Sequence, residues 1–150
     1  MTIKPRIVQL LPFIRIGGNM VFPPPFIASI QTDGSYKGGQ GRAAMIMHSS
    51  CGTIVYNNTT ALPFALDSTE TEWASVCAGL EFALSKKEGA VGIENDNLGV
   101  VRALIYRDVT LRQEYARYYR HRIQKLSNTM LWSGIRWIPR RENDADLLLR

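Results

Sequence analysis

The hydrophobic residues of this 150-residue chain change their spacing near Asp67, and this change most constrains the fold. Before Asp67, short apolar and β-branched runs alternate with turn residues, a pattern that predicts strands. These strands are expected over Phe26–Thr32, Arg42–His48 and Thr53–Tyr56. After Asp67, apolar residues recur every four positions through Glu72–Lys86, which is the spacing of a helix. Closely spaced strands followed by a helix exclude both an all-helical and an all-β fold.

The rest of the chain predicts two more strands and three more helices. They are expected as strand Ala90–Glu94, helix Asn97–Tyr106, helix Leu111–Leu126, strand Gly134–Ile138 and a short last helix, Asp144–Arg150. The element order is then βββαβααβα. This order predicts an α/β domain with a five-stranded mixed sheet flanked by helices.

The first 25 residues differ from the rest of the chain. They contain no acidic residue and end in three consecutive prolines, Pro23 to Pro25. We interpret residues 1–25 as an N-terminal arm or extension and residues 26–150 as a single folded domain, a size at which one core suffices. A targeting segment is the alternative because Lys4, Arg6 and Arg15 are basic, although no serine or small-residue cleavage site accompanies them.

Composition narrows the function classes. No stretch approaches the roughly 20 apolar residues that a membrane-spanning helix needs. Two cysteines are too few for a disulfide scaffold, which favours a reducing compartment, by default the cytoplasm. The net charge is +5, and residues 97–150 hold 11 Lys/Arg against 5 Asp/Glu. A basic half of this kind favours a polyanionic partner, most simply nucleic acid.

Four acidic residues occupy similar places in the expected elements. Asp33 closes the first strand, Glu72 lies in the first turn of the first helix, Asp96 follows the fourth strand and Asp146 opens the last helix. Ionised carboxylates that converge repel one another unless divalent cations neutralise them. Oxygen ligands favour Mg²⁺ or Mn²⁺, and two such ions form a clamp for phosphodiester chemistry.

Each of these residues also has an ordinary structural interpretation. Asp33 belongs to a common turn sequence, Asp96 and Asp146 suit helix N-termini, and Glu72 suits a solvated helix face. Taken singly, these interpretations are the simpler ones. The four residues in this order of elements favour a metal site.

Four blocks of sequence carry a resemblance to a known family. They are IQTDGSYKGGQGRAAMIM, TEWASVCAGLEFAL, VGIENDNLGVVRAL and WIPRRENDADLLLR. Together they resemble the ribonuclease H family, type 1, closest in pattern to plant and retroelement-type domains. The resemblance covers about residues 26–150 and implies the ribonuclease H-like fold.

The resemblance implies an endoribonuclease that cuts the RNA strand of RNA–DNA hybrids and leaves 5′-phosphate and 3′-hydroxyl ends. Asp33, Glu72, Asp96 and Asp146 would ligate two Mg²⁺ or Mn²⁺ ions. Asn143 lies three residues before Asp146 rather than the usual four, which leaves Asp144 open as the fourth ligand. The alternatives are another nuclease or strand-transfer enzyme of the same fold, or a catalytically degenerate nucleic-acid-binding domain.

Candidate contacts to nucleic acid follow from position and charge. The residues near the predicted metal site are Gly34, Ser35, Tyr36, Asn97 and, more weakly, Thr69 and Thr71. The basic candidates are Arg117 and Arg120 on the helix Leu111–Leu126, together with Arg140 and Arg141 after the last strand. Oligomeric state is left open, with a monomer as the default.

Overall fold

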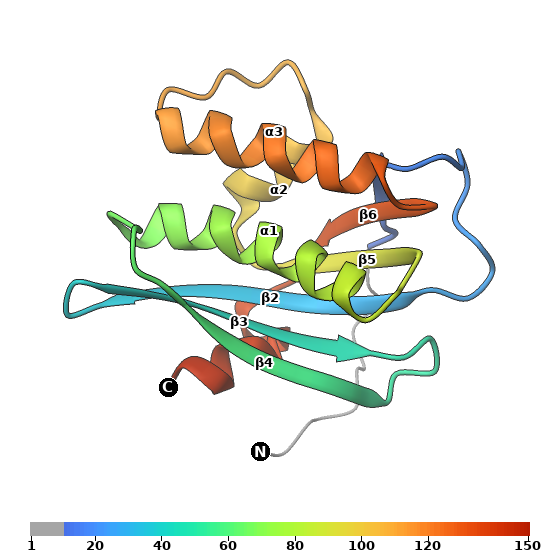
Figure 1. The fold of residues 1–150 in the computed structure, drawn as a ribbon, viewed down its shortest axis with the longest axis horizontal. Helices are drawn as coiled ribbons and strands as arrows, with labels where there is room; N and C mark the ends of the chain where they lie inside the picture. Colours follow the sequence, from blue (N-terminus) through green and yellow to red (C-terminus); the bar gives the residue numbers. More distant parts are fainter. Residues whose placement is uncertain (1–10) are drawn as a thin grey trace.

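The computed structural model describes residues 11–150, which form a mixed six-stranded sheet with the three α-helices on one face (Figure 1). The strands are β1 (Ile14–Gly17), β2 (Ala28–Lys37), β3 (Gln40–His48), β4 (Ile54–Leu62), β5 (Ala90–Asn95) and β6 (Trp132–Trp137). The helices are α1 (Ser68–Ser85), α2 (Leu98–Ile105) and α3 (Glu114–Asn128), followed by the 3₁₀ helices η1 (Arg140–Glu142) and η2 (Asp144–Leu149). The helix η2 packs on the sheet face opposite α1 (Figure 1).

The strands lie in the order β1-β6-β5-β2-β3-β4. The strands β2, β5 and β6 run parallel to one another, whereas β3 pairs antiparallel with both β2 and β4. Parallel neighbours end at the same edge of a sheet. The segments that follow β5 and β6 therefore emerge beside the C-terminal half of β2.

The β2–β3 hairpin is longer than the sequence pattern predicts. Gly38 and Gly39 connect the strands with φ of 59° and 75°, the two consecutive positive values of a type I′ turn. Residues Asp33 to Lys37 pair in register with β3, where Asp33 lies opposite Ala44. Asp33 therefore lies within β2 and not at its end, because the tight glycine turn lets pairing continue past the expected turn at Asp33 to Ser35.

Side chains on the two faces of the sheet form separate apolar clusters. The larger cluster lies between the sheet and the three α-helices, and Ile30, Leu80, Ile93 and Ile123 are completely buried in it. The smaller cluster on the other face joins β3 to η2 through residues that include Ala44 and Ile46 of the strand and Ala145 and Leu149 of η2. This second cluster holds the C-terminal segment against β3 and β2.

The predicted α/β fold with a mixed sheet is confirmed, but the sheet has six strands and not five. The additional strand β1 lies within residues 1–25, and it pairs antiparallel with β6 at the edge of the sheet. Its short apolar run beside glycines and prolines gave no strand signal. The guanidinium of Arg136 lies 3.8 Å from the ring centre of Phe13 and donates to the Leu11 carbonyl at 3.1 Å, which ties this segment to β6.

One helix end agrees with expectation, and the last helix differs from it. Asp67 caps α1 by accepting from the Glu70 N–H at 2.8 Å, as the sequence predicts. The segment Asp144–Leu149 forms a 3₁₀ helix rather than the expected α-helix. Its first turn is tightened by Asn143, whose side chain accepts from the Ala145 N–H. In residues 11–150 there is no helix with both the length and the hydropathy to cross a bilayer.

Candidate active site

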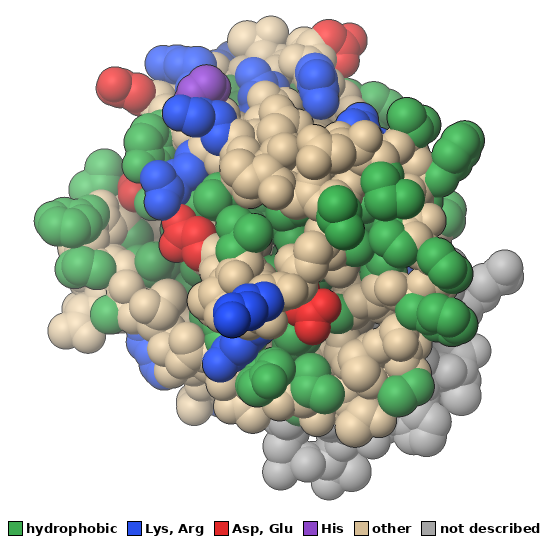
Figure 2. Space-filling view, turned by 45° about the vertical axis from the view of Figure 1, so that its right-hand side comes forward, with side chains coloured by type: hydrophobic (Ala, Val, Ile, Leu, Met, Phe, Trp, Pro, Cys, Tyr) green, Lys and Arg blue, Asp and Glu red, His purple; other side chains and the backbone are tan. Residues whose placement is uncertain are grey.

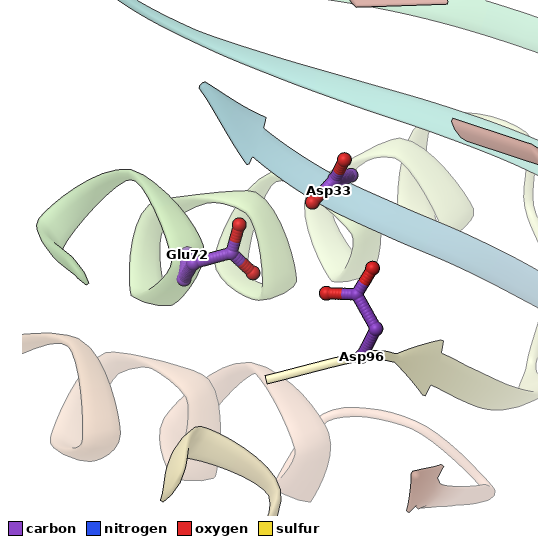
Figure 3. Close-up of side chains that lie close together, drawn as sticks. All are labelled: Asp33, Glu72 and Asp96. Carbon is purple, nitrogen blue, oxygen red and sulfur yellow. The ribbon is translucent and has the colours of Figure 1, made fainter. Parts of the chain in front are cut away.

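Three carboxylates from three elements meet at one end of the sheet. Asp33 comes from β2, Glu72 from α1 and Asp96 from the residue after β5 (Figure 3). One oxygen of each lies within 4.8 Å of the others. They line a cavity of about 340 Å³, together with Gly34, Ser68, Thr69, Asn97 and Arg140. Three of the four predicted carboxylates, Asp33, Glu72 and Asp96, thus form a cluster, and Asp146 is not part of it.

Close packing of α1 on β2 brings Glu72 to Asp33. A Cβ atom at Gly34 would lie 2.4 Å from the backbone carbonyl of Thr71, and one at Gly79 would lie 2.6 Å from the Thr32 methyl. Both distances are shorter than real contacts allow. Glycine at these two positions therefore permits the helix to approach the strand.

The backbone of Gly34 fixes two of the carboxylates. Its N–H donates to Asp33 Oδ1 at 3.0 Å and to Glu72 Oε1 at 3.1 Å. The second oxygen, Glu72 Oε2, is buried and accepts no hydrogen bond from residues 11–150. An oxygen of this kind usually requires a partner, and here a proton or a cation can supply it.

Burial and mutual repulsion change the acidity of the cluster. Burial raises the pKa of Glu72 to about 9, and the neighbouring charge of Asp33 adds to this shift. Burial likewise raises the pKa of Asp33 to about 6, although its hydrogen bond with Glu72 opposes the change. Burial also raises the pKa of Asp96. Near neutral pH the metal-free cluster therefore retains a proton on Glu72.

Two asparagines bond to the chain beside Asp33, and one of them also bonds to Asp96. The Asn143 amide donates to the Thr32 carbonyl at 2.9 Å and to Asp96 Oδ2 at 3.3 Å. The Asn95 amide donates to the same Thr32 carbonyl at 3.2 Å. The sequence interpretation used Asn143 only as a motif position and did not single out Asn95, whose one signal is that it directly precedes Asp96.

Asp146 lies beside the cluster and is held by arginines. Its Oδ2 accepts from Nε and Nη2 of Arg150 at 3.2 and 2.8 Å, and Oδ1 lies 3.8 Å from Arg140. The charge of Asp146 contributes to the raised pKa of both Asp33 and Asp96, but Asp146 is neither in the three-carboxylate group nor in the cavity lining. The assignment of Asp146 as the fourth ligand, with Asp144 as the alternative, stays a prediction.

The residues predicted to contact nucleic acid near the cluster differ in how accessible they are to a substrate. Gly34, Thr69, Asn97 and Arg140 line the cavity. Asn97 also caps α2 by accepting from the Val100 N–H at 3.1 Å. The residues Ser35 and Tyr36 follow along β2 and are half-buried. Thr71 is fully buried and its hydroxyl donates to the Ser68 carbonyl at 2.6 Å, so we assign it a packing role instead of a substrate contact.

The two arginines proposed on α3 bind their own chain. Arg117 donates to the carbonyls of Leu111 and Arg112 at 2.8 and 2.9 Å, and Arg120 donates to the Val109 carbonyl at 2.7 Å. These bonds hold the loop before α3. A guanidinium has five N–H donors, so each arginine retains donors for a phosphate. Arg141 is exposed near the cavity residue Arg140, and its Nε lies 4.0 Å from Glu142.

The donor set suits a hard divalent cation. All three clustered side chains are carboxylates, a donor type that suits Mg²⁺ and Mn²⁺ better than zinc. The buried Glu72 Oε2 offers a further ligand atom without a hydrogen-bond donor among the described residues. The raised pKa values show that the cluster resists full ionisation unless a positive charge joins it.

Comparison with known proteins identifies the family. A family model described as reverse transcriptase-like matches residues 31–147, which include Asp33, Glu72, Asp96 and Asp146. The chain belongs to this family. The prediction of a type 1 ribonuclease H domain is thereby confirmed, and solved structures show the same fold. No curated protein sequence matches the chain.

Three solved structures illustrate the shared ribonuclease H fold. Ribonuclease H1 from the halophilic archaeon Halobacterium salinarum NRC-1 has a TM-score of 0.75 and 22% identity, and the match covers 81% of this chain and 92% of that one. The N-terminal ribonuclease H domain of rv2228c from Mycobacterium tuberculosis has a TM-score of 0.71 and 19% identity, with coverage of 82% and 90%. LC11-RNase H1 in complex with an RNA/DNA hybrid has a TM-score of 0.71 and 17% identity, with coverage of 81% and 92%.

Proposed function

We propose that this ribonuclease H domain hydrolyses the RNA strand of RNA–DNA hybrids and leaves 5′-phosphate and 3′-hydroxyl ends. The observation that carries the proposal is the cluster of Asp33, Glu72 and Asp96, in which Glu72 keeps an oxygen without a hydrogen-bond donor among the described residues. The structural similarity of this chain to LC11-RNase H1, solved with an RNA/DNA hybrid, supports the choice of substrate.

In this proposal, two Mg²⁺ or Mn²⁺ ions bind Asp33, Glu72, Asp96 and Asp146. Such a pair, when bound, activates a water molecule and stabilises the leaving 3′-oxygen. The chain's own residues prepare the site. The Gly34 N–H orients the carboxylates of Asp33 and Glu72, and Glu72 releases its proton when a cation takes that proton's place.

Asp146 becomes a ligand in this proposal only after it leaves Arg150. The Arg150 side chain is 70% exposed, so solvent screens the ion pair and the pair stabilises the protein little. A divalent cation beside three other carboxylates is the stronger partner for Asp146. Arg140 borders the cavity and is 81% exposed, which allows it to turn from Asp146 to a substrate phosphate.

The proposed RNA contacts lie along the cavity wall. Gly34, Asn97 and Thr69 line the cavity, and in this proposal they and the backbone of Ser35 and Tyr36, farther along β2, meet 2′-hydroxyl and sugar groups of the RNA strand. Arg140 lines the cavity, and it and the exposed Arg141 next to it in sequence are proposed for phosphates. Arg117 and Arg120 are proposed for phosphates farther along the duplex.

The experiment compares cleavage of a labelled RNA–DNA hybrid with cleavage of duplex RNA, duplex DNA, branched DNA and single strands, in Mg²⁺ and in Mn²⁺. The proposal predicts cutting of the hybrid alone, within its RNA strand, and no cutting in EDTA. Cleavage of branched DNA would favour another nuclease of this fold. Hybrid binding without cleavage in either metal would favour a degenerate nucleic-acid-binding domain.

A further inference from the structure

A shallow hollow lies on the exposed face of α3, outside the carboxylate cavity. It has a volume of about 360 Å³ and is lined by Tyr118, His121, Arg122, Lys125, Leu126 and Thr129. These residues are spaced three or four apart, so a single helix face forms the hollow. We refer to it as the Tyr118 hollow. Figure 2 shows Lys and Arg side chains gathered at the top of the molecule, where α3 runs.

An aromatic ring stands exposed in this hollow. Tyr118 is 58% exposed, and its ring packs edge-on against Tyr119 with centroids 5.2 Å apart and planes at 76°. Tyr119 packs against the main core, so its contact restrains the Tyr118 ring while more than half of the Tyr118 residue stays exposed. A restrained, open aromatic face is a stacking platform for a flat ring such as a nucleobase.

Two basic side chains, Arg122 and Lys125, line the hollow together with this ring. The α3 segment contains three arginines and one lysine against a single acidic residue, Glu114. Arg122 forms an ion pair with Glu81 on α1, in which Nη2 lies 2.6 Å from Oε1. Lys125 has no ion pair with any described residue; in the hollow it lies one turn from His121 and directly precedes Leu126. Its ammonium is therefore free to meet an anion elsewhere in the same hollow, two turns from the aromatic ring.

We propose that the Tyr118 hollow binds an unpaired nucleotide, with its base stacked on Tyr118 and its phosphate near Lys125 and His121. Bases inside a duplex are stacked on one another and cannot lay a face on a protein ring, which favours a single strand. The hollow is lined by residues of α3 and the residue that follows it, and none of these residues lines the carboxylate cavity. Insofar as this strand flanks a hybrid held in the cavity, the inference rests on the proposed function.

The test measures binding of a fluorescent oligothymidylate of about 10 nucleotides by anisotropy, in EDTA so that no cleavage occurs. Tyr118→Ser should weaken binding about 5- to 100-fold, the usual effect of losing one stacking platform. Lys125→Gln should weaken binding and reduce its salt dependence. Tyr106→Ser and Lys87→Gln are the matched controls, because Tyr106 is also 58% exposed and both lie outside α3. Equal binding by all four variants and the wild type would overturn the inference.

A second measurement separates this inference from the proposed function. Hybrids with and without a single-stranded extension are cleaved in Mg²⁺, and the wild type should show a lower KM for the extended substrate. Tyr118→Ser should bring the ratio of the two KM values close to one. If no hybrid is cut but Tyr118→Ser still weakens oligothymidylate binding, the proposed function fails and the hollow stands. If hybrids are cut and Tyr118→Ser changes neither the KM ratio nor oligothymidylate binding, the hollow fails and the proposed function stands.

Discussion

The N–H of Gly34 donates to Glu72 Oε1 at 3.1 Å, which joins the central strand β2 to the first turns of α1. The same N–H donates to Asp33 Oδ1 at 3.0 Å. One backbone group therefore orients the carboxylates of Asp33 and Glu72, which belong to different elements and lie 39 residues apart in sequence. The geometry of the cluster depends on how closely the helix approaches this glycine.

The substitution Gly34→Ala should separate α1 from β2. The new methyl would lie 2.4 Å from the Thr71 carbonyl, so the helix or the strand must move. We expect a loss of about 1–3 kcal/mol in the free energy of unfolding. Hybrid cleavage should fall by on the order of 100-fold because the carboxylates are displaced.

The control for this change is Gly52→Ala, at a turn glycine where a new Cβ meets nothing within 4 Å, although its φ of 89° still costs some strain. Denaturant unfolding and single-turnover cleavage measure the two effects. A Gly34→Ala protein with wild-type cleavage would show that the close approach is not needed.

The stability of the metal-free protein should fall as pH rises. The pKa of Glu72 is raised from 4.5 to about 9 and that of Asp33 from 3.8 to about 6, so the folded state binds more protons than the unfolded state between these values. Stability is therefore greatest below the unfolded pKa and is lost as pH rises toward the folded pKa. Melting temperatures in EDTA from about pH 5 to pH 9 should show this decline.

Two further measurements check the cause of that decline. Glu72→Gln removes the titrating group and should flatten the curve. Added Mg²⁺ should raise the melting temperature most at the alkaline end, where the cluster is ionised. A decline of equal size in Glu72→Gln would assign the pH dependence to other groups.

Removal of Arg150 should make the site bind metal more readily. Arg150 donates two hydrogen bonds to Asp146, the proposed fourth ligand. Because exposed ion pairs contribute up to about 1 kcal/mol, Arg150→Gln should lower the Mg²⁺ concentration for half-maximal cleavage by about two- to five-fold. The matched control is Arg102→Gln on α2. If Arg150→Gln leaves the Mg²⁺ dependence unchanged while Asp144→Asn abolishes cleavage, Asp144 is the fourth ligand.

The two cysteines should react very differently with alkylating reagents. Hydrogen bonds from Ser49 and Thr53 lower the pKa of the exposed Cys51 thiol to about 7, whereas burial raises that of Cys77 to about 12. The thiolate is the reactive form, so Cys51 should alkylate at least about 100-fold faster near neutral pH. Mass spectrometry of iodoacetamide-treated protein measures both rates. Ser49→Ala is the comparison because it removes one of these hydrogen bonds. If Cys51 were labelled as slowly in the wild type as in Ser49→Ala, the assigned hydrogen bonds would be contradicted.

Much of the fold follows from patterns along the chain. The cap at Asp67 and the four-residue spacing after it place α1, and the glycine turn at Gly38 and Gly39 accounts for the β2–β3 hairpin. Short segments were harder to predict. The strand β1 is stabilised mainly by pairing with β6 and by the Arg136–Phe13 contact, neither of which leaves a local signal.

The clustered carboxylates of the candidate site could be predicted from the sequence, but the residues that hold them in place could not. Asp33, Glu72 and Asp96 stand in recognisable motifs, and the structure brings them together. The roles of Asn95 and Asn143 depend on contacts with Thr32, 63 and 111 residues away, which only the folded sheet creates. The same applies to the Arg117 and Arg120 contacts with nearby carbonyls, since a basic helix face does not reveal its partners in advance.

The most direct measurement of the central claim is cleavage of a strand-labelled hybrid by Asp33→Asn beside Asp108→Asn. Both substitutions remove one carboxylate charge, but Asp108 is exposed in the loop after α2 and lies outside the cluster. The account predicts that Asp108→Asn cuts the RNA strand like the wild type, whereas Asp33→Asn stays folded and binds hybrid without cutting it. Equal cleavage by the two variants would contradict the assignment of this cluster as the catalytic site.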